Sequence, residues 1–147
     1  MRRDHTSPDG RLERIAQFVQ ERLHEAAGRL QVPDAEVVYR WQHTLRVANY
    51  GKRLAEAEGA NVEWVVAACL LHDVSVFEPG DWHDHGRLGA AIVRPFLETI
   101  GYSPGAGENI GYSVAAHVDV EYEDMETLEA TLVSEADNID RFGAYRV

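Results

Sequence analysis

The chain has 147 residues, of which 45% are hydrophobic and 27% charged, and its formal net charge is -11. This length and composition are typical of one ordinary globular domain and exclude a disordered chain. The negative charge disfavours a nucleic-acid polymer or an anionic membrane as partner, and no apolar stretch approaches the roughly 18 residues of a membrane span. No signal-like segment opens the sequence, so we expect a cytoplasmic protein.

The first ten residues are polar and contain a Ser-Pro-Asp-Gly turn signal at residues 7–10. We therefore expect residues 1–10 to form a loose leader and residues 11–147 to form one folded domain. From Arg11 to Leu30, apolar residues recur at three- and four-residue steps, which predicts a first helix with one buried face.

A second long helix is predicted to follow, with Asp34 as its candidate N-cap and Gly59 at its end. His43 lies in the middle of this segment. We expect the helix to direct six apolar residues inward: Val37, Val38, Trp41, Leu45, Ala48 and Leu54.

Asn61 can cap a third helix that runs to about Asp73. This segment is hydrophobic on most sides, so it is expected to be central. Its single cysteine, Cys69, lies in an apolar run and is interpreted as a buried structural thiol. His72 and Asp73 would lie at its C-terminal end.

A loop from residue 75 to residue 84 separates these helices from three more. The helical patterns run from about residue 86 to 100, with a kink expected at Pro95, from about 108 to 117, and from about 124 to 142, with Gly143 as a candidate C-cap. No strand alternation competes with them. The predicted fold class is therefore all-α, a single bundle of about six helices.

The pair His72-Asp73 closes a nearly uncharged helix, where two polar side chains are costly unless each finds a partner. A divalent cation would serve both, and imidazole with carboxylate suits Mn, Fe, Co, Ni or Zn. The alternative is that Asp73 caps or pairs locally and His72 is a core histidine with satisfied hydrogen bonds. Two other histidines, His5 and His24, are expected to be solvated.

The sequence resembles the HD-domain superfamily of metal-dependent phosphohydrolases over about residues 35–145. That family's motif is a histidine on one helix, a His-Asp pair ending a later helix and a distant aspartate on another. The matching residues are His43 in WQHTLRV, His72-Asp73 in ACLLHDV and Asp137 in EADNID. The resemblance implies an HD-type bundle in which these four side chains bind a divalent ion and leave coordination positions open.

Two further histidines, His85 and His117, resemble positions at which some HD proteins bind a second ion or contact the substrate phosphate. His83 competes with His85 for this role, and a surface position at a helix end is the alternative for His117. The resemblance thus implies one or two divalent ions, with Mn, Fe, Co, Ni, Zn and Mg as candidates.

Two groups of residues are candidates for contact with the substrate: arginines close to the histidines, and carboxylates in the loop after Asp73. Arg46 lies three residues after His43, on nearly the same helix face, and could bind a phosphate, with an ion pair as the alternative. Arg87 has the same two interpretations. In the loop, Asp81 or Glu78 could protonate a leaving group or orient water, as a carboxylate in this loop is thought to do in nucleotidase relatives, although the Pro-Gly turn alone explains polar residues there.

The leading hypothesis is an enzyme, a metal-dependent phosphohydrolase that acts on a nucleotide or another small phosphoester through a metal-activated water, with Asp73, Asp81 and Arg46 as candidate catalytic residues. Two alternatives remain open, because some HD proteins are di-iron oxygenases and others are non-catalytic modules that bind a metal or a nucleotide. The absence of a charged residue directly after Asp73 and the short segment after Asp137 favour the module. A small phosphorylated substrate is the expected partner, and the apolar helix faces would permit a homodimer.

Overall fold

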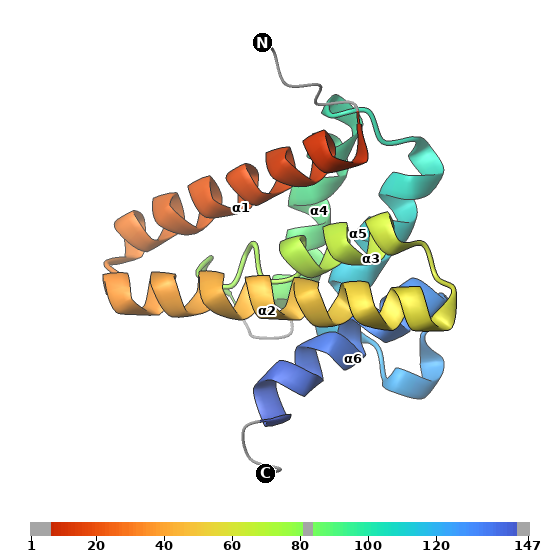
Figure 1. Ribbon diagram of the computed structural model, residues 1–147. Coiled ribbons are helices and arrows are strands. Elements are labelled where there is room, and N and C mark those ends of the chain that lie inside the picture. Colours follow the sequence, from red (N-terminus) through yellow and green to blue (C-terminus); the bar gives the residue numbers. More distant parts are fainter. Residues whose placement is uncertain (1–6, 81–83, 144–147) are drawn as a thin grey trace.

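The computed structural model describes residues 7–80 and 84–143, and every regular element in that part of the chain is helical (Figure 1). The all-α prediction, with six α-helices, is confirmed. None of these helices is long and apolar enough to cross a lipid bilayer. The elements are α1 Pro8–Leu30, α2 Asp34–Glu58, α3 Val62–Leu71, α4 Asp84–Thr99, α5 Pro104–Asp119, the 3₁₀ helix η1 Tyr122–Asp124, and α6 Leu128–Gly143.

Helix α1 begins earlier than predicted. The Ser7 hydroxyl accepts a hydrogen bond from the Gly10 amide at 3.1 Å, and Pro8 occupies the first turn, where its missing amide proton costs nothing. The turn signal at residues 7–10 is therefore a helix start, and the expectation of a leader is wrong for residues 8–10. Residues 1–6, including His5, lie outside the described residues.

The boundaries of α2 and α3 follow the predicted caps closely. Pro33, one residue before Asp34, is the N-cap of α2, and Gly59 ends the helix with a left-handed φ of 74°. The Asn61 side chain accepts a hydrogen bond from the Trp64 amide at 3.1 Å and so caps α3. Because α3 ends at Leu71, His72 and Asp73 stand at its exit.

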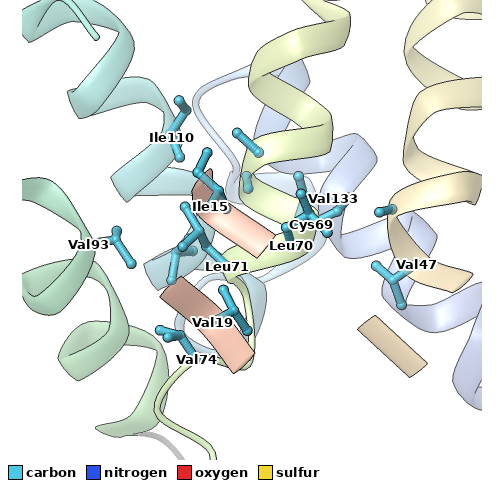
Figure 2. Close-up of a cluster of buried hydrophobic side chains, with 14 of the residues drawn as sticks. Ile15, Val19, Val47, Cys69, Leu70, Leu71, Val74, Val93, Ile110 and Val133 are labelled. Atoms are coloured by element: carbon cyan, nitrogen blue, oxygen red, sulfur yellow. The ribbon is translucent and has the colours of Figure 1, made fainter. Parts of the chain in front are cut away.

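Helix α3 is central, as predicted. Figure 2 shows its side chains Leu70 and Leu71 between Val93 of α4 and Val47 of α2, and the same buried cluster includes residues of α1, α5 and α6. In Figure 1, α1 and α2 are two long helices joined at one end, and α6 packs against α2. The shared core explains why residues from several helices can meet at the exit of α3.

Two residues of α2 lie on a different face from the predicted one. Val38 and Leu45 are 55% and 46% exposed, whereas Thr44 is fully buried. Thr44 tolerates burial because its hydroxyl donates to the Arg40 carbonyl oxygen at 2.9 Å. Apolarity alone therefore misplaced the buried face, and Leu30 at the end of α1 is likewise 45% exposed.

The last three helices differ from their predicted limits mainly at their starts. Helix α4 continues past Pro95 to Thr99, and α5, capped by the Ser103 side chain, starts at Pro104, four residues before the predicted start. Helix α6 starts at Leu128 instead of Asp124, because Tyr122–Asp124 forms η1 and the Thr127 hydroxyl accepts from the Ala130 amide at 3.0 Å.

Candidate metal centre

Six predicted ligands from five parts of the chain converge on one buried point. Helices α2, α4, α5 and α6 supply one or more of them, and the exit of α3 supplies the His-Asp pair. Their side chains are at least nine-tenths buried. The six are His43, His72, Asp73, His85, His117 and Asp137.

Asp73 lies at the centre of this cluster and faces two pairs of histidines. Its Oδ2 is 3.6 Å from His43 Nε2 and 3.2 Å from His72 Nε2. Its Oδ1 is 3.4 Å from His85 Nε2 and 3.6 Å from His117 Nε2. One carboxylate thus joins two groups of ligands, each with an oxygen of its own.

Asp137 closes the first group from α6. Its Oδ1 is 3.1 Å from His43 Nε2 and 3.5 Å from His72 Nε2. The second group contains Asp73, His85 and His117. In each three-residue group that includes Asp73, the candidate ligand atoms lie within 4.8 Å of one another.

The hydrogen bonds of the rings direct lone pairs toward this point. His72 Nδ1 donates to the Cys69 carbonyl oxygen at 2.6 Å, and His117 Nδ1 donates to the Val114 carbonyl oxygen at 2.5 Å. A carbonyl only accepts, so the proton of a neutral ring sits on Nδ1 and its Nε2 carries a lone pair. These lone pairs then face carboxylate oxygens, an arrangement that requires a proton or a metal cation among them.

In the metal-free site, the close approach of these groups shifts the pKa values of one histidine and two aspartates. Burial lowers the pKa of His72, but Asp73 and Asp137 outweigh it and raise the pKa well above its usual value. Burial raises the pKa of Asp73, but His72, His117 and His85 outweigh it and hold this pKa well below its usual range. The pKa of Asp137 is likewise lowered, because hydrogen bonds with His43 and His72 outweigh burial.

The donor set fits a divalent metal ion. The site offers carboxylate oxygens and buried imidazole nitrogens, and in His43, His72 and His117 the other ring nitrogen is already hydrogen-bonded. This set matches the mixed ligand preference of Mn, Fe, Co, Ni and Zn. The two clusters sharing Asp73 could hold one ion or two. The local alternative for His72 and Asp73, a cap beside a core histidine, explains neither the four other ligands nor their shared direction.

Two glycines bring the ligand-bearing helices close together. A Cβ added at Gly51 in α2 would lie 2.5 Å from Cys69 Sγ in α3. A Cβ at Gly86 in α4 would meet the Val118 side chain and lie 2.7 Å from the Ala115 carbonyl oxygen in α5. Cys69 is fully buried, as predicted, and burial raises the pKa of its thiol, so it serves this packing.

A small cavity of 170 Å³ opens beside the ligands. Besides four of the six ligands it is lined by three residues that sequence analysis did not identify, Tyr39, Arg40 and Arg141. Arg40 Nη1 is 2.9 Å from Asp73 Oδ2, and Arg141 Nη1 is 3.9 Å from Asp137 Oδ2. A signal was available, because Arg40 precedes His43 by three residues and Arg141 follows Asp137 by four, spacings that share a helix face.

Asp140 is a further residue that sequence analysis missed. Its Oδ2 lies 2.6 Å from His43 Nδ1, and its Oδ1 lies 2.7 Å from Arg46 Nε. Burial raises the pKa of Asp140, but Arg46 and His43 outweigh it, so the pKa is lowered. Arg46 is thus in the ion pair weighed as the alternative to a phosphate contact.

The remaining candidates lie away from the six ligands or beyond the described residues. Arg87 pairs with Asp119 at 2.7 Å, and Glu78 pairs with Arg29 at 3.0 Å, so each is in a salt bridge. Asp81 and His83 lie outside the described residues. His24 is exposed, as predicted.

Comparisons with known proteins agree with this architecture. A search of curated proteins finds no match. The fold is similar to the crystal structure of a predicted HD superfamily hydrolase from an uncultured Thermotogales bacterium, with a TM-score of 0.67, 20% sequence identity, and coverage of 90% of this chain and 74% of that one. The HD domain family model matches residues 40–141, which contain all six candidate ligands. The chain therefore belongs to the HD domain family.

Proposed function

We propose that this protein is a metal-dependent hydrolase that cleaves a phosphoester, with a nucleotide or another small phosphorylated molecule as substrate. The observation that carries the proposal is Asp73, whose two oxygens each face two histidines beside an arginine-lined cavity. Such a centre can hold one or two ions and still leave positions for water and substrate. A hydrolase of this kind needs no protein nucleophile.

The bound ion would supply a water of lowered pKa and would polarise a phosphoryl oxygen. The chain's own residues would do the rest. Asp73 and Asp137 would hold the ligand geometry, and Asp73 would accept a hydrogen bond from the attacking water. Arg40 and Arg141 lie at the cavity beside these carboxylates and would offset the negative charge of the phosphoryl group.

The size of the cavity supports a small reacting group. At 170 Å³ it is well below the roughly 300–1,000 Å³ of pockets that enclose drug-sized ligands. It would admit the phosphoryl group, while the rest of the substrate would lie outside the described walls. The net charge of -11 makes the two arginines important, because the protein as a whole repels anions.

A di-iron oxygenase is the second candidate. The observation that favours it is that all six donors of the ordered His, His-Asp, His, His, Asp set lie in one cluster with Asp73 between the two halves. Bound iron together with oxygen consumption would support this candidate over the hydrolase.

Phosphate release is the first experiment. The purified chain is assayed on a panel of nucleotides and sugar phosphates with Mn, Co, Ni, Mg or Fe, beside a His72→Ala/Asp73→Ala variant. A matched control is His24→Ala/Glu25→Ala, which removes an adjacent histidine and carboxylate from an exposed part of α1. We expect the wild type and the control variant to release phosphate when metal is present, and the His72→Ala/Asp73→Ala variant to release none.

The other results separate the candidates. Iron binding with oxygen consumption and no phosphate release would favour the oxygenase. Ion or nucleotide binding without turnover under any condition would favour a non-catalytic module.

A further inference from the structure

We propose that Asp140 is a positioning residue that fixes the His43 ring for metal binding and is itself held in place by Arg46. This inference rests on the metal centre of the proposed function. It assigns a shared task to two residues outside the six candidate ligands: Arg46, which sequence analysis considered as a phosphate contact or an ion pair, and Asp140, which it missed.

The contacts form a continuous chain across two helices. His43 is in α2, and its Nδ1 lies 2.6 Å from Asp140 Oδ2 in α6. On the other side, Arg46 Nε is 2.7 Å from Asp140 Oδ1, and Arg46 Nη2 is 3.2 Å from Asp140 Oδ2. The Asp140 side chain is 8% exposed, whereas Arg46 is 45% exposed, so the carboxylate is covered and its charge is balanced from the solvent side.

This arrangement fixes which nitrogen of His43 faces the ion. An ionised carboxylate only accepts hydrogen bonds, so Nδ1 carries the proton and Nε2 keeps its lone pair. That Nε2 is the atom that lies 3.1 Å from Asp137 Oδ1 and 3.6 Å from Asp73 Oδ2. A carboxylate behind a ligating imidazole also makes the imidazole a stronger donor to metal.

His72 and His117 are held differently. Each of their Nδ1 atoms bonds a backbone carbonyl three residues earlier in its own segment, at Cys69 and Val114. Those rings are oriented by local structure, which forms with the segment. His43 is oriented from another helix by a charged group, so its direction depends on how α6 packs against α2.

Arg46 makes this carboxylate available to His43. The bidentate pair fixes both oxygens of Asp140, which leaves Oδ2 directed at the ring. It also keeps a third carboxylate from adding its full negative charge beside Asp73 and Asp137. Loss of Arg46 should therefore weaken the arrangement less than loss of Asp140, because the bond to His43 would remain.

The test measures binding of Co²⁺ alone to the full chain by calorimetry and by its visible absorption spectrum. The variants are Asp140→Ala, Asp140→Asn and Arg46→Gln. Asp119→Asn is the matched control, because Asp119 is also a carboxylate paired with an arginine between two helices. We expect Asp140→Ala to lose about 10- to 100-fold in affinity and to change the spectrum, with Asp140→Asn and Arg46→Gln losing less.

A second measurement needs no metal. Imidazole ¹⁵N shifts of the metal-free chain should show His43 protonated at Nδ1 in the wild type, whereas in Asp140→Ala the proton should move to Nε2, which faces Asp137 Oδ1 at 3.1 Å. Asp119→Asn should leave affinity, spectrum and these shifts unchanged, and equal thermal stability of the metal-free Asp140 and Asp119 variants would separate positioning from folding.

Two results would overturn the inference in different ways. If Asp140→Ala binds Co²⁺ as tightly as the wild type with the same spectrum, the positioning role is refuted and the metal centre stands. If the wild type binds no ion at all, the proposed metal centre itself fails and the role toward a metal fails with it.

Discussion

The two halves of the candidate metal centre are built differently. The holding half consists of His43, His72 and Asp137 from α2, the exit of α3 and α6. The exchange half consists of His85 and His117 from α4 and α5. Asp73 serves both, so the holding half offers four donors with two carboxylates, whereas the exchange half offers three donors with the same single carboxylate.

This difference suggests a division of labour. More protein donors and more negative charge give tighter binding of a divalent cation, whereas fewer donors leave coordination positions open to water and substrate. The holding half is also supported from behind by Asp140, and its His72 is completely buried. We therefore expect a first ion to stay in the holding half and a second ion to bind the other half more weakly.

The largest effect should come from removing one histidine from each half. His72→Gln should abolish tight metal binding and lower any hydrolytic activity by about 10²–10³-fold or more, because positioned water and charge stabilisation are lost together. His117→Gln should keep one tightly bound ion and lose only the weaker one. Metal content after dialysis and activity of both variants check this.

A control is needed because His72 is buried. Circular dichroism of the metal-free variants would show that both still fold. Equal loss of metal from both halves in each variant would contradict the comparison and indicate a single cooperative site.

The next effect is a pH dependence of the stability of the metal-free chain, caused by titrating groups of the holding half. The pKa of His72 is raised in the metal-free fold, so its stabilising charge is fully present below its unfolded value of 6.5 and is lost as pH rises through the folded pKa. The pKa values of Asp73 and Asp137 are lowered, so their contribution is present above 3.8 and is lost as pH falls through their folded values. The metal-free chain should thus become less stable above pH 6.5.

Metal binding should show the opposite trend. His72 must lose its proton to bind an ion, so affinity should rise by up to about tenfold per pH unit in the range where one proton is released. Calorimetry in two buffers of different ionisation enthalpy measures that proton directly. Binding without proton release at pH 6.5 would show that His72 is already neutral.

The smallest effects should come from the two close helix crossings. Gly51→Ala would place a methyl group against Cys69, on the helix that carries His43 of the holding half. Gly86→Ala would place one against the α5 backbone, on the helix that carries His85 of the exchange half, and each change should cost about 1–3 kcal/mol in stability. Adding Cys69→Ala should relieve the first clash, because it removes the sulfur. Adding Val118→Ala should not relieve the second, because the Ala115 carbonyl remains in place.

Thermal unfolding would measure the stability of both variants, and metal titration would measure their affinity for each ion. We expect Gly51→Ala to weaken the tight ion and Gly86→Ala to weaken the second ion. If both glycine variants changed the same ion, the two crossings would not set the two halves independently.

Much of the fold could be predicted from the sequence, and so could the six candidate ligands that the structure brings together. The helix caps at Asn61 and Gly59 are identified from neighbouring residues, whereas the candidate ligands follow the order of the HD motif along the chain. The buried face of α2 was mispredicted in part because it includes Gly51, which lies close to α3, and Thr44, whose hydroxyl bonds the Arg40 carbonyl oxygen, and an apolar pattern reveals neither.

The supporting residues were harder to identify for a related reason. Asp140 and Arg46 are ordinary surface-type residues in sequence, and their task appears only when α6 lies across α2. The contact of Arg40 with Asp73 likewise joins residues that are 33 positions apart. Helical spacing would have placed Arg40 beside His43 and Arg141 beside its partner Asp137, but could not have identified Asp73 as the partner of Arg40.

The contact between Arg40 and Asp73 has a consequence for how the protein matures. In the metal-free chain, Arg40 and a protonated His72 place positive charge beside Asp73 and Asp137, so the buried acids are compensated before any ion arrives. We therefore expect the polypeptide to leave the ribosome and fold to completion in cells starved of metal. The ion would then bind after folding, and on binding it would displace the proton of His72 and the Arg40 side chain. The supply of the ion, and not the rate of protein synthesis, would limit this step.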